Sequence, residues 1–568
     1  MLLIECGSVL LAVLIASISP TVGSRWFESL ERGFARFARR RGLAVLVVGL
    51  TALALRAALL PILPIPAPAI TDEFSYLLMA DTFAHGRATN PTHPMWIHFE
   101  SFAIIQKPTY CSAFYPAQGL FMAVGQVIGG HPFWGMWFSI GAMCAAICWM
   151  LQAWLPPRWA MLGGLLAAVR LGSFSYWATT YDGGTVAAIG GALVLGALPR
   201  IRRQQRARDA LLMGLGLAIL ANSRPYEGLF LSLPVCAALL VWLLSKNAPP
   251  RKLTLQRILL PLFLMLLATV VAMGYYFWRT TGSPFNTPYL VNLRTYFVVP
   301  NFPWSRLGPM PKYNHAVMER FYTGWPLGAY ELARKHAILL AVTKAVSLGF
   351  FFLGPLLALP FVMLGIALPQ GMSFEGIDNN TRFLLLVCGV SFVGLLLPIY
   401  FNPHYAAPIT GAIYALVLLA MRRLVPWRWQ EKPTGVALIR FIPVMCVFLL
   451  LLRVGAGPLH ISLPEALPAS WWRVGPQNLS RAQVLSQLQR DSEQHLVIVR
   501  YSATHYLNIE WVYNSADIDK SKVIWARDMP EAQNEELVRY FKGRRVWLLD
   551  PDEVPPKLSS YHEDRWSQ

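Results

Sequence analysis

Four short segments of the sequence place charged side chains of both signs beside long apolar runs. Asp72 and Glu73 follow the proline-rich segment LLPILPIPAPAI after one threonine. Lys107 lies in IIQKPTYCSAFYPAQG, Asp182 in TTYDGGTVA and Arg224 in NSRPYEG. A carboxylate can accept the proton of an attacking hydroxyl, and a fixed cation can stabilise a departing phosphate. The set therefore supplies both kinds of group that transfer from a lipid-phosphate donor would need.

Each of these residues also has an ordinary structural explanation. Asp72 and Glu73 could cap a helix, and Asp182 could form a simple turn, since Asp-Gly is itself a turn signal. Arg224 could extend to lipid head groups, and Lys107 could be a solvated lysine. The transfer chemistry gains weight because all four segments are expected at the same membrane face.

Aromatic and polar residues beside these segments are further candidates. They are Tyr110, Tyr115, Tyr226, Glu227, His404 and Tyr405, the last two in YFNPHYAAP. His404 could equally be an interfacial residue that is hydrogen-bonded to the backbone.

A metal cluster could be drawn from the first long loop, which contains His85, His93, His98 and Glu100. These residues lack the compact His-x-x-x-His type of spacing that is typical of zinc sites. A lipid phosphate can leave without a metal when cations are already fixed in place. We therefore expect no obligatory metal and no other obligatory cofactor.

Composition indicates a membrane protein. Of the 568 residues, 55% are hydrophobic, only 14% are charged and twenty are tryptophan, more apolar sequence than one soluble core could hide. Apolar runs of about 17 to 25 residues, each able to cross roughly 30 Å of hydrocarbon, predict eleven or twelve spanning helices. The twelfth is the run LIECGSVLLAVLIASI, interpreted as a span rather than a cleaved signal peptide. The predicted spans are 2–19, 43–63, 132–152, 159–178, 183–199, 209–222, 228–244, 258–278, 347–368, 383–400, 408–421 and 436–455.

The net charge of +19 comes largely from basic clusters in alternate loops. The clusters are SRWFESLERGFARFARRRG, PRIRRQQRARD, KNAPPRKLTLQR and MRRLVPWRWQEK. This asymmetry is typical of a polytopic protein whose basic loops are cytoplasmic, and it argues against nucleic-acid binding. The loops 64–131 and 279–347 and the tail from residue 458 are then outside. Most of the seven cysteines lie inside predicted spans, so no disulfide framework is expected.

Two outer regions have recognisable elements. Residues 70–87 have helical spacing, which predicts an amphipathic helix on the outer surface with Asp72 and Glu73 at its N-terminal end. In the tail, HLVIVRY, SKVIWAR and RRVWLLD predict strands and EAQNEELVRYF predicts a helix. We expect an all-α polytopic membrane protein with a small C-terminal α/β domain, divided at residues 1–42, 43–457 and 458–568.

The order of these features resembles the GT-C glycosyltransferases, specifically the relatives of protein O-mannosyltransferases and of the lipid A aminoarabinose transferase. The resemblance covers residues 43–455 and rests on four features: Asp-Glu opening the first outer loop, Lys-Pro-x-Tyr later in it, an Asp at the next outer hairpin, and many spans. It implies a GT-C-like fold and an inverting transfer of a sugar from a polyprenyl-phosphate donor to a hydroxyl of a lipid, glycan or protein acceptor.

The resemblance also implies roles for individual residues. Asp72 is the candidate base with Glu73 beside it, and Asp182 matches the second acidic position of the family. Lys107 matches the lysine that contacts the carrier phosphate in the aminoarabinose transferases, although the segment after it reads Pro-Thr-Tyr instead of the usual Pro-Pro. Arg224 is our own addition as a second phosphate contact.

A transporter or lipid flippase is the alternative function, since it too would use polar residues near membrane faces. Transporters place ionisable residues near mid-membrane, often in matching halves, whereas the acidic candidates here lie at one predicted face. A receptor with an outer sensory domain would not need Asp72, Lys107 and Asp182 together. We expect a bacterial inner-membrane enzyme whose active site and C-terminal domain are periplasmic.

Overall fold

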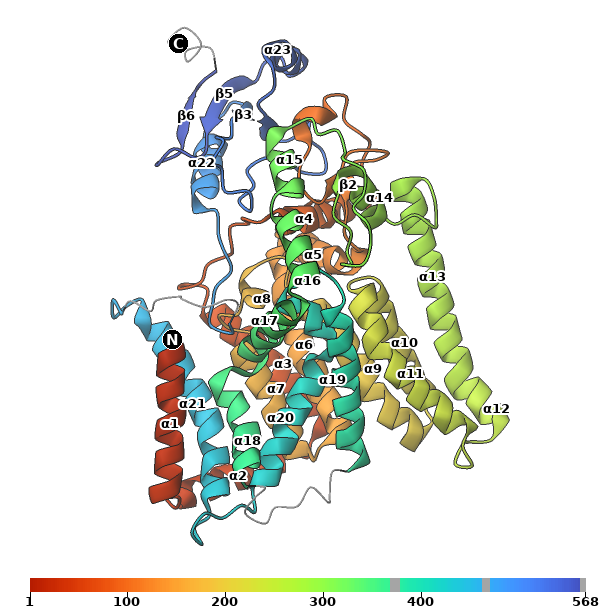
Figure 1. Cartoon of the computed structure of the whole chain (residues 1–568), viewed down its shortest axis with the longest axis vertical. Helices are drawn as coiled ribbons and strands as arrows, with labels where there is room; N and C mark the ends of the chain where they lie inside the picture. The colour runs from red at the N-terminus through yellow and green to blue at the C-terminus, as the bar shows by residue number, and fades with distance from the viewer. Residues whose placement is uncertain (368–377, 462–469, 562–568) are drawn as a thin grey trace.

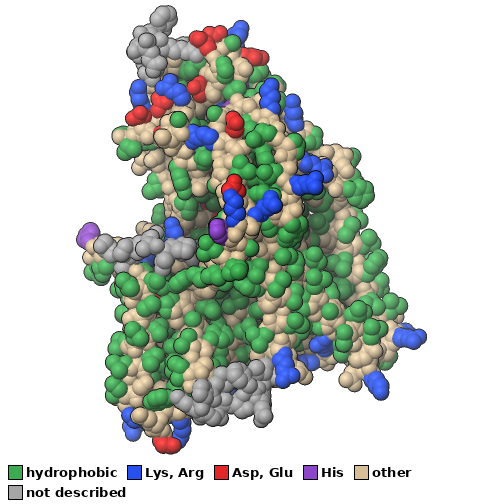
Figure 2. Space-filling model, viewed as in Figure 1, with side chains coloured by type: hydrophobic (Ala, Val, Ile, Leu, Met, Phe, Trp, Pro, Cys, Tyr) green, Lys and Arg blue, Asp and Glu red, His purple; other side chains and the backbone are tan. Residues whose placement is uncertain are grey.

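The computed structural model describes residues 1–367, 378–461 and 470–561. Within these residues, nine helices are long and apolar enough to cross a membrane, and hydrophobic side chains cover the middle of the bundle (Figure 2). They are Arg41–Ala58 (α3), Phe133–Trp154 (α6), Thr185–Gln204 (α9), Pro225–Leu244 (α11), Arg251–Thr281 (α12, η2 and α13), Ala337–Ala367 (α17, η3 and α18), Asn379–Leu396 (α19), Pro403–Leu424 (η5 and α20) and Thr434–Ala456 (α21). The fold is that of a polytopic integral membrane protein.

Three shorter helices coincide with the remaining predicted spans. Leu2–Ile18 (α1) has 17 residues, and Pro157–Leu171 (α7) and Ala207–Ala221 (α10) have 15 each. A straight crossing needs about 20 residues. Each of the twelve predicted spans therefore corresponds to a helix, and nine of these reach spanning length within the described residues.

Small residues let the central helix α9 approach its neighbours closely. Gly190 of α9 and Gly216 of α10 face each other, and a Cβ on Gly216 would lie 2.7 Å from the Gly190 carbonyl oxygen. A Cβ on Gly191 would lie 1.8 Å from the Pro408 carbonyl oxygen. Close backbone packing of this kind replaces the hydrophobic effect as the force that joins helices in lipid. It holds the N-terminal end of α9, which follows Asp182, against η5.

Shorter elements connect the spans, and all of them except Ser24–Ala38 lie toward the end of the molecule that carries the candidate site (Figure 1). They are Ser24–Ala38 (α2), Thr71–Ala84 (α4), Trp96–Phe99 (η1), Ile104–Ile105 (β1), Cys111–Ser112 (β2), Pro116–Gly129 (α5), Tyr176–Thr179 (α8), Pro288–Tyr296 (α14), Ala316–Thr323 (α15) and Trp325–Lys335 (α16). β1 and β2 pair antiparallel.

Helix α4 forms where the sequence predicted a helix, but it does not lie on the surface as an amphipathic element. Ten of its residues, including Phe74 and Leu78, are buried. Tyr513 of the tail stacks on Phe74 with ring centroids 4.9 Å apart, and the Ala516 amide donates to Asp81 at 2.7 Å. The tail covers the face that the sequence pattern assigned to solvent.

The C-terminal tail folds into the predicted α/β unit. Its four-stranded sheet has the order β4-β3-β5-β6 and comprises His495–Val499 (β3), Val523–Arg527 (β4), Arg545–Asp550 (β5) and Lys557–Ser560 (β6). β3 pairs parallel with β4 and β5, and β6 pairs antiparallel with β5. The helices are Leu479–Arg490 (α22) and Glu531–Tyr540 (α23). The sheet lies beyond one end of the helical bundle, above α4 and α15 in Figure 1.

The two long loops and the tail share hydrophobic cores at this end of the bundle. Phe102 of the first loop packs with Tyr296 and Phe321 of the second, and Tyr501 of the tail packs against them. Tyr110 packs in another core with Leu496 of β3. The three regions predicted to share one side of the membrane therefore form one structure, which surrounds the candidate site.

Candidate functional site

Asp72 lies in the first turn of α4 and is half-buried. Its carboxylate has one weak side-chain hydrogen bond, donated by the Thr71 hydroxyl to Oδ1 at 3.4 Å. Burial and the nearby Asp182 raise the pKa of Asp72 to about 6, while Arg224 and Thr71 offset part of the rise. The group is thus accessible and little engaged, and it is a stronger base than an ordinary aspartate.

Glu73 is the neighbour of Asp72 in sequence but has a different environment. Its side chain is fully buried, and Oε2 accepts hydrogen bonds from the amides of Ala69 at 2.9 Å and Ile70 at 3.2 Å. Oε1 accepts from the Tyr181 amide at 3.0 Å. Burial and Asp182 raise the pKa of Glu73, against the effect of the three amides. Because both oxygens are engaged, Glu73 joins two loops rather than facing a substrate.

Asp182 lies in the loop that precedes α9 and is buried. Its Oδ1 accepts a hydrogen bond from the Thr180 hydroxyl at 2.6 Å. Burial raises the pKa of Asp182, and Thr180 and Arg224 oppose the rise. Gly184 allows the loop to pack tightly, since a Cβ there would lie 2.5 Å from the Trp177 ring. The Tyr181 amide, which binds Glu73, fixes this loop against the start of α4.

Arg224 immediately precedes α11 and is half-buried. Its guanidinium lies over the Tyr405 ring, 4.5 Å from the centroid, a favourable cation–π position. It is close enough to lower the pKa of both Asp72 and Asp182. Glu227, in the first turn of α11, is a further carboxylate beside this cation. One cation and three carboxylates therefore meet at one end of the bundle.

Several of the other candidates border this cluster. Tyr115 lies between Phe277 and Tyr289, at centroid distances of 6.4 and 6.5 Å. His404 is buried, and its Nδ1 is 3.0 Å from the Tyr176 hydroxyl.

Tyr226 points elsewhere along α11. Its hydroxyl donates to the Gly394 carbonyl at 3.0 Å. This contact joins α11 to α19, which gives Tyr226 a packing role.

The structure does not place Lys107 and Tyr110 with the others. Lys107 is exposed, and its ammonium lies 4.2 Å from the centroid of the Trp96 ring. It also lies near Glu100, where it offsets part of the rise in pKa that burial causes. Tyr110 is buried and donates to the Asn514 carbonyl at 3.0 Å. Lys107 thus makes a contact within the first loop, and Tyr110 joins this loop to the tail.

The four residues considered as a metal cluster have separate partners. His85 contacts Asp81, and His93 Nε2 lies 2.9 Å from Asp519. Glu100 accepts from Tyr296 at 2.9 Å and Asn314 at 2.8 Å, and His98 approaches the Arg527 carbonyl. Across the described residues, no three His, Cys, Asp or Glu side chains form a group that could hold a metal ion.

Sequence reasoning missed the contribution of the tail to the site. The Glu510 amide donates to the Ala69 carbonyl at 3.0 Å, and the Gly475 amide donates to the Thr179 hydroxyl at 3.0 Å. These contacts hold the segments that precede Asp72 and Asp182. They join residues several hundred positions apart, and no local pattern in the sequence signals them.

Comparison with known proteins detects similarity of structure only. No family model matches the chain, and no curated protein matches it. The oligosaccharyltransferase of Archaeoglobus fulgidus in the apo form is similar, with a TM-score of 0.49 and 12% identity over 89% of this chain and 69% of that one. The archaeal AglB in complex with an inhibitory peptide and a dolichol-phosphate gives a TM-score of 0.41, at 12% identity and the same coverage. ArnT from Cupriavidus metallidurans bound to undecaprenyl phosphate gives 0.46, at 12% identity over 89% of this chain and 92% of that one.

Proposed function

We propose that this protein is a membrane glycosyltransferase that moves a sugar from a polyprenyl-phosphate donor to an acceptor hydroxyl. The observation that carries the proposal is the pairing of Asp72, half-buried and little engaged, with Arg224 at one end of a polytopic bundle. A base and a fixed cation in one place are what a lipid-phosphate leaving group requires.

In the proposed reaction, Asp72 accepts the proton of the acceptor hydroxyl. The acceptor oxygen then forms a bond to the anomeric carbon as the bond from that carbon to the phosphate oxygen breaks. The electron pair stays on the phosphate, which leaves as the lipid monophosphate, and one displacement inverts the configuration. No step uses a metal.

The supporting residues have separate tasks in this scheme. Arg224 neutralises the departing phosphate. Glu73 fixes the distance between the Asp72 and Asp182 loops, and Asp182 raises the basicity of Asp72. Lys107, the other predicted phosphate contact, lies over the Trp96 ring, and we assign the main phosphate contact to Arg224. The reaction is proposed for the outer face of a bacterial inner membrane.

The alternative of a transporter or flippase is disfavoured by the position of the acidic groups. Asp72 lies in the first turn of the short helix α4, and Asp182 lies in the loop before the spanning helix α9, so both are outside the spanning helices. Transport across the bilayer would favour ionisable groups near mid-membrane.

The test uses purified full-length protein in lipid nanodiscs with a panel of radiolabelled polyprenyl-phosphate sugars and an envelope extract. We expect the label to move to an acceptor, free polyprenyl phosphate to accumulate, and Asp72→Asn to slow both by about 10²–10⁴-fold. Transfer should survive EDTA. Movement of an intact lipid-linked sugar across a liposome membrane, with its glycosidic bond unbroken, would overturn the proposal in favour of a flippase.

A further inference from the structure

A cavity of about 500 Å³ lies between α6, α9, α11 and α19. It is formed by the last residue of α6, the last turns of α9, the second half of α11 and the first half of α19. Thr185 at the start of α9 is next to the Asp182 loop, and Arg202 near its end lines the cavity. At 1.5 Å per residue these positions are about 26 Å apart, close to the roughly 30 Å thickness of the hydrocarbon core. The cavity therefore lies at the membrane face opposite the candidate active site.

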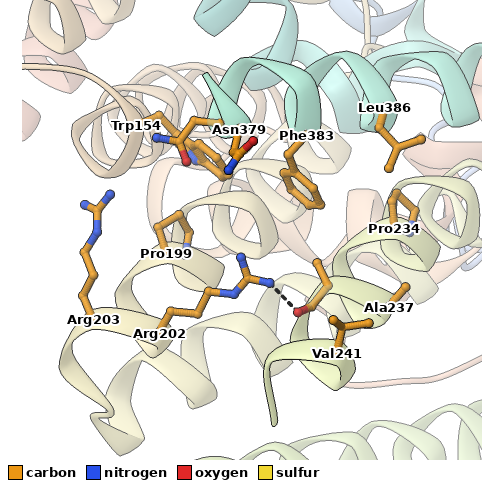
Figure 3. A pocket seen from close by; sticks show the side chains of 12 residues that line it. Trp154, Pro199, Arg202, Arg203, Pro234, Ala237, Val241, Asn379, Phe383 and Leu386 are labelled. Atoms are coloured by element: carbon orange, nitrogen blue, oxygen red, sulfur yellow. Dashed lines mark hydrogen bonds between the residues drawn. The ribbon is translucent and has the colours of Figure 1, made fainter. Parts of the chain in front are cut away.

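The lining combines positive charge with apolar surface (Figure 3). Arg202 and Arg203 supply two cations, and Asn379 and Asn380 supply amide groups from the first turn of α19. The other eight lining residues are apolar, and none of the twelve is acidic. Asp378, directly before Asn379, accepts from the Thr381 amide at 3.1 Å and caps α19.

The two arginines are anchored in a way that leaves donors for a ligand. Arg202 Nη2 donates to the Ala238 carbonyl of α11, and Arg203 Nη1 donates to the Ala153 carbonyl at 3.1 Å. The Nε atom of Arg202 is buried and has no hydrogen-bond partner within the described part of the chain. A buried guanidinium nitrogen without a partner is costly, and a phosphate oxygen would satisfy it.

The apolar part of the cavity continues onto the lipid-facing surface. The Trp154 and Phe383 rings stack at 5.8 Å with an interplanar angle of 7°. Val241 and Leu386 line the cavity and are 69% and 54% exposed. Leu244, one turn beyond Val241, is 78% exposed. A soluble anion would gain nothing from these surfaces, whereas acyl chains would cover them.

We infer that this cavity binds the head group of an anionic glycerophospholipid from the leaflet opposite the active site. The phosphate lies against Arg202 and Arg203, and the acyl chains run along α11 and α19. The size of the cavity falls within the usual range for ligand sites. This inference does not depend on the proposed transfer reaction.

The test measures retained lipid on full-length protein by native mass spectrometry, with titration of phosphatidylglycerol, phosphatidylcholine or inorganic phosphate. Arg202→Gln with Arg203→Gln removes the cations of the cavity. The matched control, Arg206→Gln with Arg208→Gln, removes the same charge from the same basic cluster outside the lining. Ala237→Trp fills the cavity without a change of charge, and monodisperse elution during size-exclusion chromatography verifies the fold of each variant.

We expect phosphatidylglycerol to bind about tenfold or more weakly to the Arg202/Arg203 variant, because charged donors are lost, and to the Ala237→Trp variant. The control should bind as the natural sequence does, and phosphatidylcholine should bind weakly to all. Equal losses in the control would show general attraction to a basic surface and overturn the inference. Competition by inorganic phosphate as effective as that by the lipid would assign the cavity to a soluble anion and refute the lipid.

Discussion

Neutralisation of Asp72 should lower mainly the rate of transfer, whereas neutralisation of the adjacent Glu73 should lower mainly the stability of the fold. Asp72→Asn keeps an oxygen that can accept the 3.4 Å hydrogen bond from Thr71, and it removes a charge near a helix N-terminus, a loss of about 0.3–1 kcal/mol. The cost of holding a partly buried charge disappears at the same time, so the net change in stability should stay below about 1 kcal/mol. Loss of the general base should slow transfer by about 10²–10⁴-fold.

Glu73→Gln should act mainly on stability. The glutamate oxygens accept three amide hydrogen bonds at 2.9, 3.2 and 3.0 Å. An NH₂ group cannot accept a hydrogen bond, whereas either oxygen of a carboxyl can, whether it is ionised or protonated. At least one buried amide therefore loses its partner, at a cost of about 1–3 kcal/mol. Transfer should fall less than in Asp72→Asn.

Two measurements separate these effects: thermal unfolding in detergent, and single-turnover transfer at saturating donor. The expected pattern is a stable, inactive Asp72→Asn and a less stable, partly active Glu73→Gln. Near-normal turnover in Asp72→Asn would show that Asp72 only caps the helix. A stable Glu73→Gln with the greater loss of rate would show that the base had been assigned to the wrong carboxylate.

Three further predictions follow from the geometry of the site. Because the base must be ionised and the pKa of Asp72 is raised to about 6, the rate of transfer by the natural sequence should fall about tenfold per pH unit below that value. A rate that stays constant down to pH 4.5 would exclude Asp72 as the base. Arg224→Gln should weaken donor binding and move this acid limb to higher pH, since the cation now lowers the pKa of Asp72, whereas Arg224→Lys should shift it less. Tyr513→Ala should lower the rate of transfer by about 10- to 100-fold through misplacement of α4. Tyr513→Phe keeps the stack on Phe74 and should leave the rate unchanged. Equal rates in the two variants would show that this contact of the tail does not affect transfer.

The helices, and the end of the bundle at which the candidate residues lie, could be predicted because they depend on short-range patterns. Apolar runs define spans, and Asp72, Asp182 and Arg224 each adjoin a helix start. Alternation of basic loops then places all three at one face. Topology thus predicts a shared face, whereas the proximity of these residues depends on how the helices and loops pack.

The positions of Lys107 and Tyr110 could not be predicted in the same way. Both lie in a long loop whose path depends on the tail, through contacts such as Tyr110 with Asn514. The burial of α4 has the same cause, since Tyr513 and Ala516 of the tail contact the helix that was predicted to lie in water. The sequence pattern of α4 is compatible with a helix in water and with a buried helix, and contact with the distant tail determines that it is buried.

The contacts of Glu73 and of the tail suggest that the two carboxylate loops are positioned from both sides. Ala69, before Asp72, donates its amide to Glu73 and accepts the Glu510 amide at its carbonyl. On the other loop, Tyr181 donates to Glu73 while Thr179 accepts from Gly475. Each loop is therefore held by the same buried carboxylate and by the same tail. Because Asp182 contributes to the raised pKa of Asp72, the basicity of Asp72 depends on this double attachment, and the C-terminal segment is part of the proposed active site although it supplies none of the predicted catalytic groups.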